Sequence, residues 1–163
     1  MIPWPVAELV PHSGNALLID DIVSFDALGL TARCTIKPGG LYNQADGSLP
    51  AWLGLEIMAQ AVAAWAGCQA RRDEIPVEKG PSKRDPVKLG FLLGTRRYEC
   101  HVDSFAAGSQ LSVHVSCAMQ DDAGMGTFAC DITQDGQVLA AARLNAYSPP
   151  NVNEFIHEEA PAP

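Results

Sequence analysis

A single glutamate lies inside a run of residues otherwise suited to a protein core. Residues 53–67 read LGLEIMAQAVAAWAG, and Glu56 is the one charged residue among them. Burying a lone carboxylate is costly, so it needs a partner, a shifted ionisation or a chemical role. Burial favours the neutral acid, whereas a nearby helix N-terminus favours the carboxylate. A carboxyl group balanced between these effects is suited to general acid or base catalysis near neutral pH.

The alternative is a purely structural glutamate. Gln60 follows Glu56 by four residues and therefore lies on the same helical face, one turn later. Gln60, a backbone group or an arginine such as Arg96 would each satisfy a buried carboxylate. The residues alone leave the catalytic and structural interpretations open.

Histidine is the usual partner of a carboxyl group in proton transfer. His12 follows Pro11 in the turn-like stretch PHSGN, which favours its presentation to a cleft, and the alternative is a histidine that caps or packs the N-terminus. His101 and His114 fall in predicted strands, where we expect surface or packing roles. His157 falls in the C-terminal segment.

The elements that must position these residues are a helix and a sheet. An Ala-rich segment from about Pro50 to Arg72 is apolar on nearly every side, and such a helix must be wrapped. Two strand patterns precede it, ALLIDDIVSF and LTARCTI, and about four follow it from residue 87 onward. We therefore predict an α+β fold in which a curled antiparallel sheet of about six strands surrounds one long central helix.

One domain is expected over residues 1–148, followed by a flexible acidic tail over residues 149–163. The polar, proline-broken stretch DEIPVEKGPSKRDP is expected to be a mobile excursion between the helix and the later strands.

Composition excludes several classes of function. The net charge of −8 disfavours nucleic-acid binding. Five cysteines without a CxxC pair argue against a disulfide framework and a zinc site, so no metal is expected. The N-terminus lacks the pattern of a signal peptide, and a charge makes residues 51–68 a poor membrane span. We expect a cytoplasmic protein without a membrane role.

The basic residues are concentrated in one window of the chain. Eight of eleven fall within residues 71–97, which carry only four of the nineteen acidic residues. The simple interpretation is a solvated loop, and the functional one is a dock for an anionic ligand or partner.

Three segments resemble the hotdog-fold 3-hydroxyacyl-carrier-protein dehydratases, the FabZ/FabA group. LPAWLGLEIMAQAVA resembles the central-helix signature of this group, with its catalytic acid and the following Met-Ala-Gln. VPHSGNALLIDDIV resembles the N-terminal segment, and LGFLLGTRRYECHV resembles the strand that lines the acyl tunnel. The similarity spans about residues 8–148 and is greatest to the branch linked to aryl polyene synthesis.

The histidine of the family's Gly-His-Phe-Pro motif is missing. Tyr42 stands in its place, fourteen residues before Glu56, and YNQADGSLP contains no histidine. His12 is the best replacement, and Asn43, Gln44 and Asp46 are weaker candidates to polarise a carbonyl or place a water.

The resemblance implies dehydration of a 3-hydroxyacyl thioester to an enoyl thioester, with His12 as the base and Glu56 as the acid. Substrate contacts are expected from a further set: Gln60, Gly54, Trp52, Gly90, Phe91 and Gly94. No cofactor is implied beyond the phosphopantetheine of the substrate's carrier protein or CoA.

The resemblance also implies a site formed between two protomers, in a homodimer or a heterodimer with another hotdog protein. An acidic acyl carrier protein is expected to dock on Arg71, Arg72, Lys79, Lys83 and Arg84. Two alternatives remain: a hotdog thioesterase, which needs a helix carboxylate but no histidine, and a non-catalytic subunit of a dehydratase heterodimer.

Overall fold

The long helix predicted from the Ala-rich segment forms the centre of the molecule. The computed structural model describes residues 2–73 and 90–148, apart from the side chains of Asp73 and Phe91. Helix α1 (Gly54–Asp73) follows a single 3-10 turn, η3 (Ala51–Leu53). Pro50 precedes the turn, and two arginines occupy the last turn of α1, where the helix dipole favours cations.

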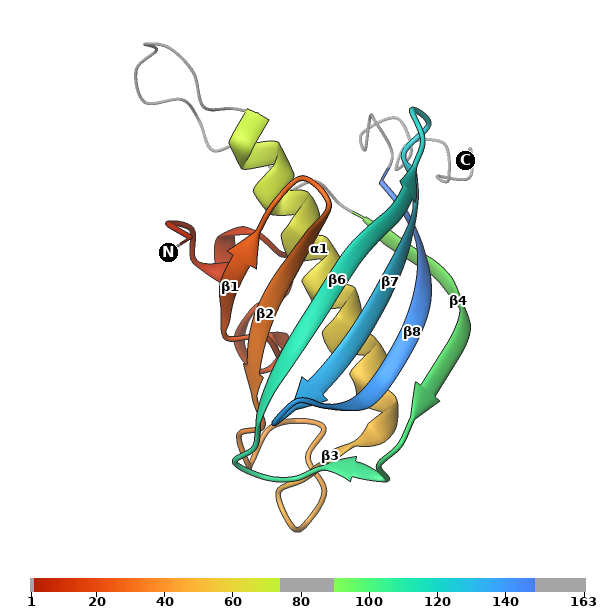
Figure 1. The fold of residues 1–163 in the computed structure, drawn as a ribbon. Helices are drawn as coiled ribbons and strands as arrows, with labels where there is room; N and C mark the ends of the chain where they lie inside the picture. The colour runs from red at the N-terminus through yellow and green to blue at the C-terminus, as the bar shows by residue number, and fades with distance from the viewer. Residues whose placement is uncertain (1, 74–89, 149–163) are drawn as a thin grey trace, which may run out of the picture.

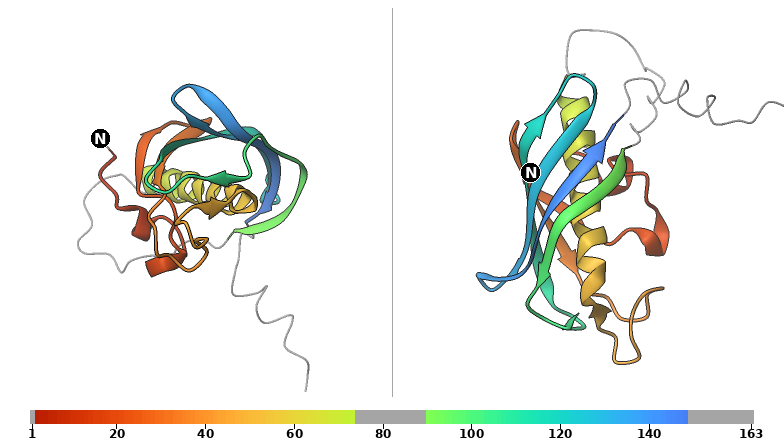
Figure 2. Two further views of the ribbon diagram at one scale, coloured as in Figure 1. Left: turned by 90° about the horizontal axis from the view of Figure 1, so that it is seen from below. Right: turned by 90° about the vertical axis from the view of Figure 1, so that its right-hand side faces the viewer.

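The sheet curls around α1, as expected for a helix without a polar face (Figures 1 and 2). Its six strands are antiparallel and lie in the order β1-β2-β6-β7-β8-β4. Their bounds are β1 (Asp21–Phe25), β2 (Gly29–Thr35), β4 (Phe91–Cys100), β6 (Gln110–Gln120), β7 (Met125–Gln134) and β8 (Gln137–Tyr147). A separate pair, β3 (Leu49–Pro50) with β5 (Ser104–Phe105), lies where η3 and α1 begin.

Burial alternates along β6 and defines its inward face. Leu111, Val113 and Val115 are buried against the helix side, while Ser112 and His114 between them are only half-buried. β4 pairs with β8 alone and has two register shifts, so it is the bent edge strand of the sheet.

Helix α1 is long and apolar enough to cross a membrane by composition alone. Of its most apolar 18-residue window, 56% is buried inside the fold. A core helix has this property, because the sheet around it buries its apolar side chains.

The N-terminal segment differs from the prediction. The strand expected from residue 16 begins at Asp21, and residues 14–16 form a 3-10 turn instead. The reason is that the backbone on either side of Leu17 bonds to Gln60 of α1 rather than to a neighbouring strand. Residues 9–20, here called the strap, thus lie along the helix. The predicted excursion after α1 and the predicted C-terminal tail lie outside the described residues.

Candidate active site

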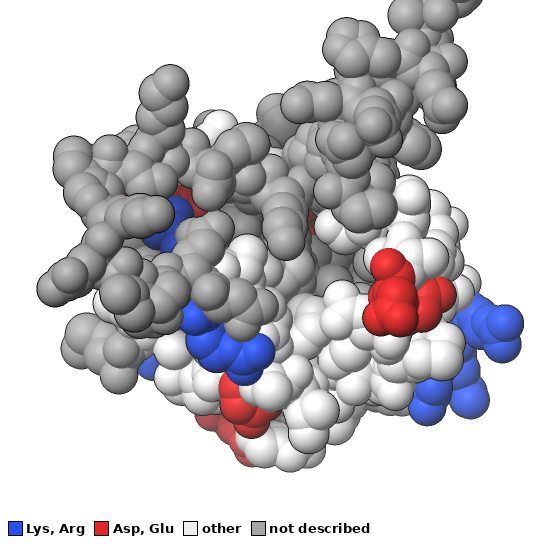
Figure 3. All heavy atoms as spheres, turned by 90° about the horizontal axis from the view of Figure 1, so that it is seen from above, with Lys and Arg blue, Asp and Glu red and all other residues white. Residues whose placement is uncertain are grey.

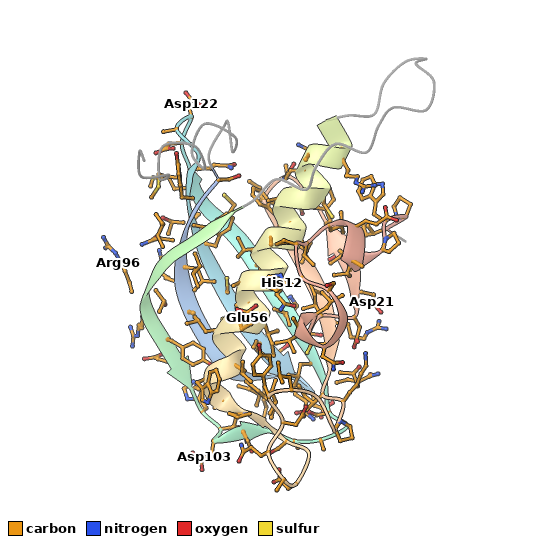
Figure 4. The ribbon with its side chains drawn as sticks, turned by 180° about the vertical axis from the view of Figure 1, so that it is seen from behind. His12, Asp21, Glu56, Arg96, Asp103 and Asp122 are labelled. Carbon is orange, nitrogen blue, oxygen red and sulfur yellow. The ribbon has the colours of Figure 1, made fainter. Side chains whose placement is uncertain are left out.

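His12 of the strap lies beside Glu56 of α1. Nε2 of His12 is 3.0 Å from Oε1 of Glu56, and the two side chains come from the strap and from α1 (Figure 4). Both are about one-third exposed (31% and 39%), so a substrate can reach them. Nδ1 of His12 is buried and has no hydrogen-bond partner among the described residues. A carboxyl group and an imidazole in contact can take one proton and give another.

Close approach of the strap to the helix depends on Gly67. A Cβ at this position would lie 2.5 Å from the backbone oxygen of Leu9 and 3.1 Å from its Cα, closer than atoms can pack. Glycine thus lets the strap backbone rest on α1 at Leu9, three residues before the chain reaches His12.

Asp20 fixes the other end of the strap. Its carboxylate accepts hydrogen bonds from the Thr35 backbone N–H (2.7 Å) and from Nζ of Lys37 (2.5 Å). Burial opposes ionisation of this carboxyl group, but the hydrogen bonds from Lys37 and Thr35 outweigh it and keep the pKa of Asp20 below its usual value.

An apolar cavity of about 240 Å³ begins at the pair and extends toward the C-terminal half of α1. One wall is a stripe of small residues at helical spacing, Ala59, Ala63 and Ala66. The floor includes Trp65 and Phe128, whose rings meet edge to face with centroids 5.4 Å apart. The remaining lining residues are Pro11, His12, Glu56, Val62, Gly90, Leu92, Gln120, Gly124, Gly126, Leu144, Ala146, Tyr147 and Ser148.

The expected substrate contacts divide into two groups. Gly90 lines the cavity, but Gly94 and Trp52 do not, and the Trp52 side chain is 65% exposed. The N–H of Gly54 already bonds to the carbonyls of η3, so it is not a free donor. The side chain of Phe91 lies outside the described residues. Gln60 is fully buried and does not line the cavity.

The alanine stripe was missed by the sequence reasoning. A signal for it exists, because alanines at positions 59, 63 and 66 recur every three or four residues on the helical face that carries Glu56. Trp65 is both buried in the core and part of the cavity floor.

Two of the weaker candidates, Asn43 and Asp46, have structural partners. Nδ2 of Asn43 donates to the Gly47 carbonyl (2.7 Å), and Asp46 accepts hydrogen bonds from the backbone and hydroxyl of Ser48. His114 lies within 3.1 Å of the Thr31 hydroxyl on the neighbouring strand, in keeping with its expected packing role. No group of three metal-ligating side chains occurs in the described part of the chain.

Of the expected docking arginines, Arg71 and Arg72 are engaged within the chain. Arg71 contacts the Glu8 carboxylate (3.2 Å), and the Arg72 guanidinium lies 5.9 Å from the Phe25 ring centroid. Lys79, Lys83 and Arg84 lie outside the described residues. From the end where α1 finishes, the visible Lys and Arg side chains form separate groups rather than one continuous field (Figure 3).

Comparison with solved structures identifies the fold class. The E. coli PaaI protein from the phenylacetic acid degradation operon superposes with a TM-score of 0.56, at 14% identity, over 78% of this chain and 81% of that one. A mutant (Asp52Ala) hypothetical thioesterase from Streptococcus pneumoniae TIGR4 gives a TM-score of 0.57 at 11% identity, over 78% and 88% of the chains. At these identities the similarity shows a hotdog fold and no more.

A closer similarity identifies the family. The family model described as ApeP dehydratase matches residues 4–157, so the chain belongs to the ApeP-like dehydratase family. A chain of the dehydratase heterocomplex ApeI:P from Xenorhabdus doucetiae superposes with a TM-score of 0.81, at 28% identity, over 96% of this chain and 99% of that chain. No curated protein sequence matches the chain.

Proposed function

We propose that this chain removes water from a 3-hydroxyacyl thioester and yields an enoyl thioester. The observation that carries the proposal is the 3.0 Å contact between His12 and Glu56 at one end of an apolar cavity. Membership of a dehydratase family supports the reaction class.

The reaction needs one group to remove a proton and another to deliver one. His12 takes the proton from C2, and the electron pair left behind forms the C2–C3 double bond. The C3–O bond breaks, and the hydroxyl leaves as water with a proton from Glu56. Transfer of one proton from His12 to Glu56 then restores the pair, and the two groups are already in contact.

The substrate's acyl group fits the cavity by its chemistry. Alanine, aromatic and aliphatic side chains give it an apolar lining, which suits a hydrocarbon tail and excludes water from the reacting carbons. The thioester is carried on the phosphopantetheine arm of a carrier protein or on CoA, and an acidic carrier docks on the basic window of residues 71–97.

A second hotdog subunit is also part of the proposal. The ApeI:P structure is a dehydratase heterocomplex, and its similar chain supports a heterodimeric partner for this one. Strand β4 lies at the edge of the sheet and exposes Leu92 and Leu93. A second subunit on this edge would cover these apolar side chains and the open backbone groups of the strand.

The test is mass spectrometry of a 3-hydroxyacyl-carrier thioester incubated with wild type, Glu56→Gln and His12→Ala, each alone and with the co-purified partner subunit. We expect loss of one water with wild type and none with either variant. Release of free acid and thiol would instead indicate a thioesterase. Full water loss by a complex containing either variant would show that this chain is the non-catalytic subunit.

A further inference from the structure

Gly126 and Phe128 face the same side of strand β7, where both line the apolar cavity. A Cβ built on Gly126 would lie 2.7 Å from Cε2 and 3.0 Å from Cζ of the Phe128 ring, closer than atoms can pack. The edge of the ring therefore occupies the space that a side chain at position 126 would need. The position of Phe128 in the cavity floor depends on this glycine.

Trp65 limits the movement of the Phe128 ring on its other side. The two rings meet edge to face with their planes 68° apart, and the indole N–H of Trp65 donates to the carbonyl of Asp26 (3.3 Å). Only 4% of Phe128 and 3% of Trp65 is exposed, so both rings are packed on most sides. A ring displaced by a new Cβ therefore moves into the cavity, which is the empty space that it borders.

We propose that Gly126 is a specificity-determining residue, which keeps the far part of the cavity open for long acyl tails. With glycine at this position, the Phe128 ring lies back over β7, and the cavity continues past Trp65. Its far end lies at the hairpin between β6 and β7, on the side of the molecule where α1 finishes (Figure 1). Trp65 follows Glu56 by nine residues, or about two and a half helical turns, so only a long hydrocarbon tail reaches this part.

This inference rests on the proposed function and adds to it a substrate class, 3-hydroxyacyl thioesters with long hydrocarbon tails, and the residue that admits them. His12 and Glu56 lie at the other end of the cavity, and neither contacts Phe128. A change at position 126 should therefore act on long tails and spare the reaction of short ones.

The kinetic test compares Gly126→Ala with wild type on 3-hydroxybutyryl- and 3-hydroxydecanoyl-pantetheine, each with the co-purified partner subunit. The variant adds one carbon, and kcat/KM for the decanoyl thioester should fall by about tenfold or more, because the tail loses its apolar contacts. The butyryl value should stay within about twofold. Ala129→Ser, which adds one oxygen to the outer face of the same strand, is the matched control and should keep both values within about twofold. Equal losses on both substrates, or an unchanged decanoyl value, would overturn the inference.

A second substitution tests whether the effect passes through the Phe128 ring. Phe128→Leu removes the ring carbons that a Cβ at position 126 would meet. The double variant Gly126→Ala with Phe128→Leu should therefore regain most of the kcat/KM that Gly126→Ala loses on the decanoyl thioester. A double variant as impaired as Gly126→Ala would contradict the proposed role of the ring. If Gly126→Ala fails to fold, recovery of a folded double variant that accepts the decanoyl thioester supports the same contact, and a folded double variant that rejects it overturns the inference.

A binding test does not depend on activity. S-decyl-pantetheine is a thioether of the same tail length that cannot react, and isothermal titration calorimetry gives its Kd for wild type, Gly126→Ala and Ala129→Ser. Gly126→Ala alone should weaken binding by about tenfold. An equal Kd for all three proteins would refute the inference. A wild type that dehydrates no substrate but shows the expected difference in Kd would refute the proposed function and leave Gly126 as the residue that keeps the cavity open.

Discussion

His12 and Glu56 show how far residue types alone can lead. The isolated carboxylate in an apolar helix correctly marked Glu56 as unusual, because burial of a charge needs a compensating partner. The sequence also made His12 the best histidine to act with it. Neither argument supplied a distance, and the 3.0 Å contact depends on the path of the strap.

The five cysteines give a prediction at the same scale. All are free thiols, and burial raises the pKa of Cys34 and of Cys130 from 9.0 to about 12. Between about pH 9 and about pH 12 the unfolded chain therefore loses thiol protons that the folded chain retains. The free energy of unfolding should fall through this range, by up to about 1.4 kcal/mol per pH unit for each thiol.

Urea unfolding of wild type and Cys130→Val at about pH 8 and about pH 11 measures this effect. Lysines and tyrosines titrate in both proteins, so the difference between the two pH slopes isolates one thiol. The variant should lose less stability than wild type between the two pH values. Identical slopes would show that the Cys130 thiol ionises equally in both states.

At the scale of elements, the strap and α1 build the site together. The Gln60 side chain bonds to the strap backbone on both sides of Leu17. Gly67, in the C-terminal half of α1, permits the contact with Leu9. The strap is the element that the sequence patterns misassigned, because ALLID is a short apolar run typical of a strand, while its backbone bonds to a side chain.

Gly67→Ala tests the role of this contact. In an unobstructed helix the change would stabilise the protein by about 1 kcal/mol, because alanine is the better helix former. Here the new Cβ meets the Leu9 backbone, so the sign should reverse and dehydratase activity should fall as His12 is displaced. Thermal unfolding and turnover check the two effects, and a rise in Tm with full activity would show that the strap moves freely.

The alanine stripe of α1 leads to a prediction about substrate length. Trp65 follows Glu56 by nine residues, or about 13.5 Å along the helix. An extended hydrocarbon chain advances by about 1.25 Å per bond, so a tail of about ten carbons spans this length. Ala63→Phe should fill the middle of the cavity and leave the space beside His12 and Glu56, where the reacting carbons bind, unchanged.

Wild type and Ala63→Phe are compared on 3-hydroxybutyryl- and 3-hydroxydecanoyl-pantetheine. The variant should keep kcat/KM within about twofold on the short thioester and lose about tenfold or more on the long one, equivalent to about 1.4 kcal/mol of transition-state stabilisation. Equal losses on both substrates would mean that the acyl tail lies elsewhere.

At the scale of the whole molecule, one chain supplies both members of the pair. The family resemblance implies a site shared between protomers, and the strap here brings His12 to Glu56 of the same chain. Association with a second subunit would then shape or cover the cavity without completing the pair.

Co-expression of His12→Ala with Glu56→Gln distinguishes the two arrangements. If each pair lies within one chain, every mixed assembly stays inactive. If pairs form across a symmetric dimer, random mixing restores about a quarter of wild-type activity. A parallel mixture of wild type with the double variant shows whether mixed assemblies form and tolerate an inactive chain.

The sequence by itself determined the elements whose local pattern is strong. The helix over Glu56 and the strands after residue 90 follow from the periodicity of apolar side chains, which acts over a few residues. The same local reasoning singled out Glu56 and His12 and paired Gln60 with Glu56 on one helical face.

The tertiary structure alone decided which side chains face the substrate. Gln60 became a buried support, Gly54 lost its free N–H and Trp52 turned to solvent, while Ala59, Ala63 and Ala66 came to line the cavity. These outcomes depend on where the strap and the curled sheet lie over α1. Contacts between segments distant in the chain leave no local pattern, and hydrogen bonds such as Leu18 to Gln60 outweigh the strand propensity of their own segment.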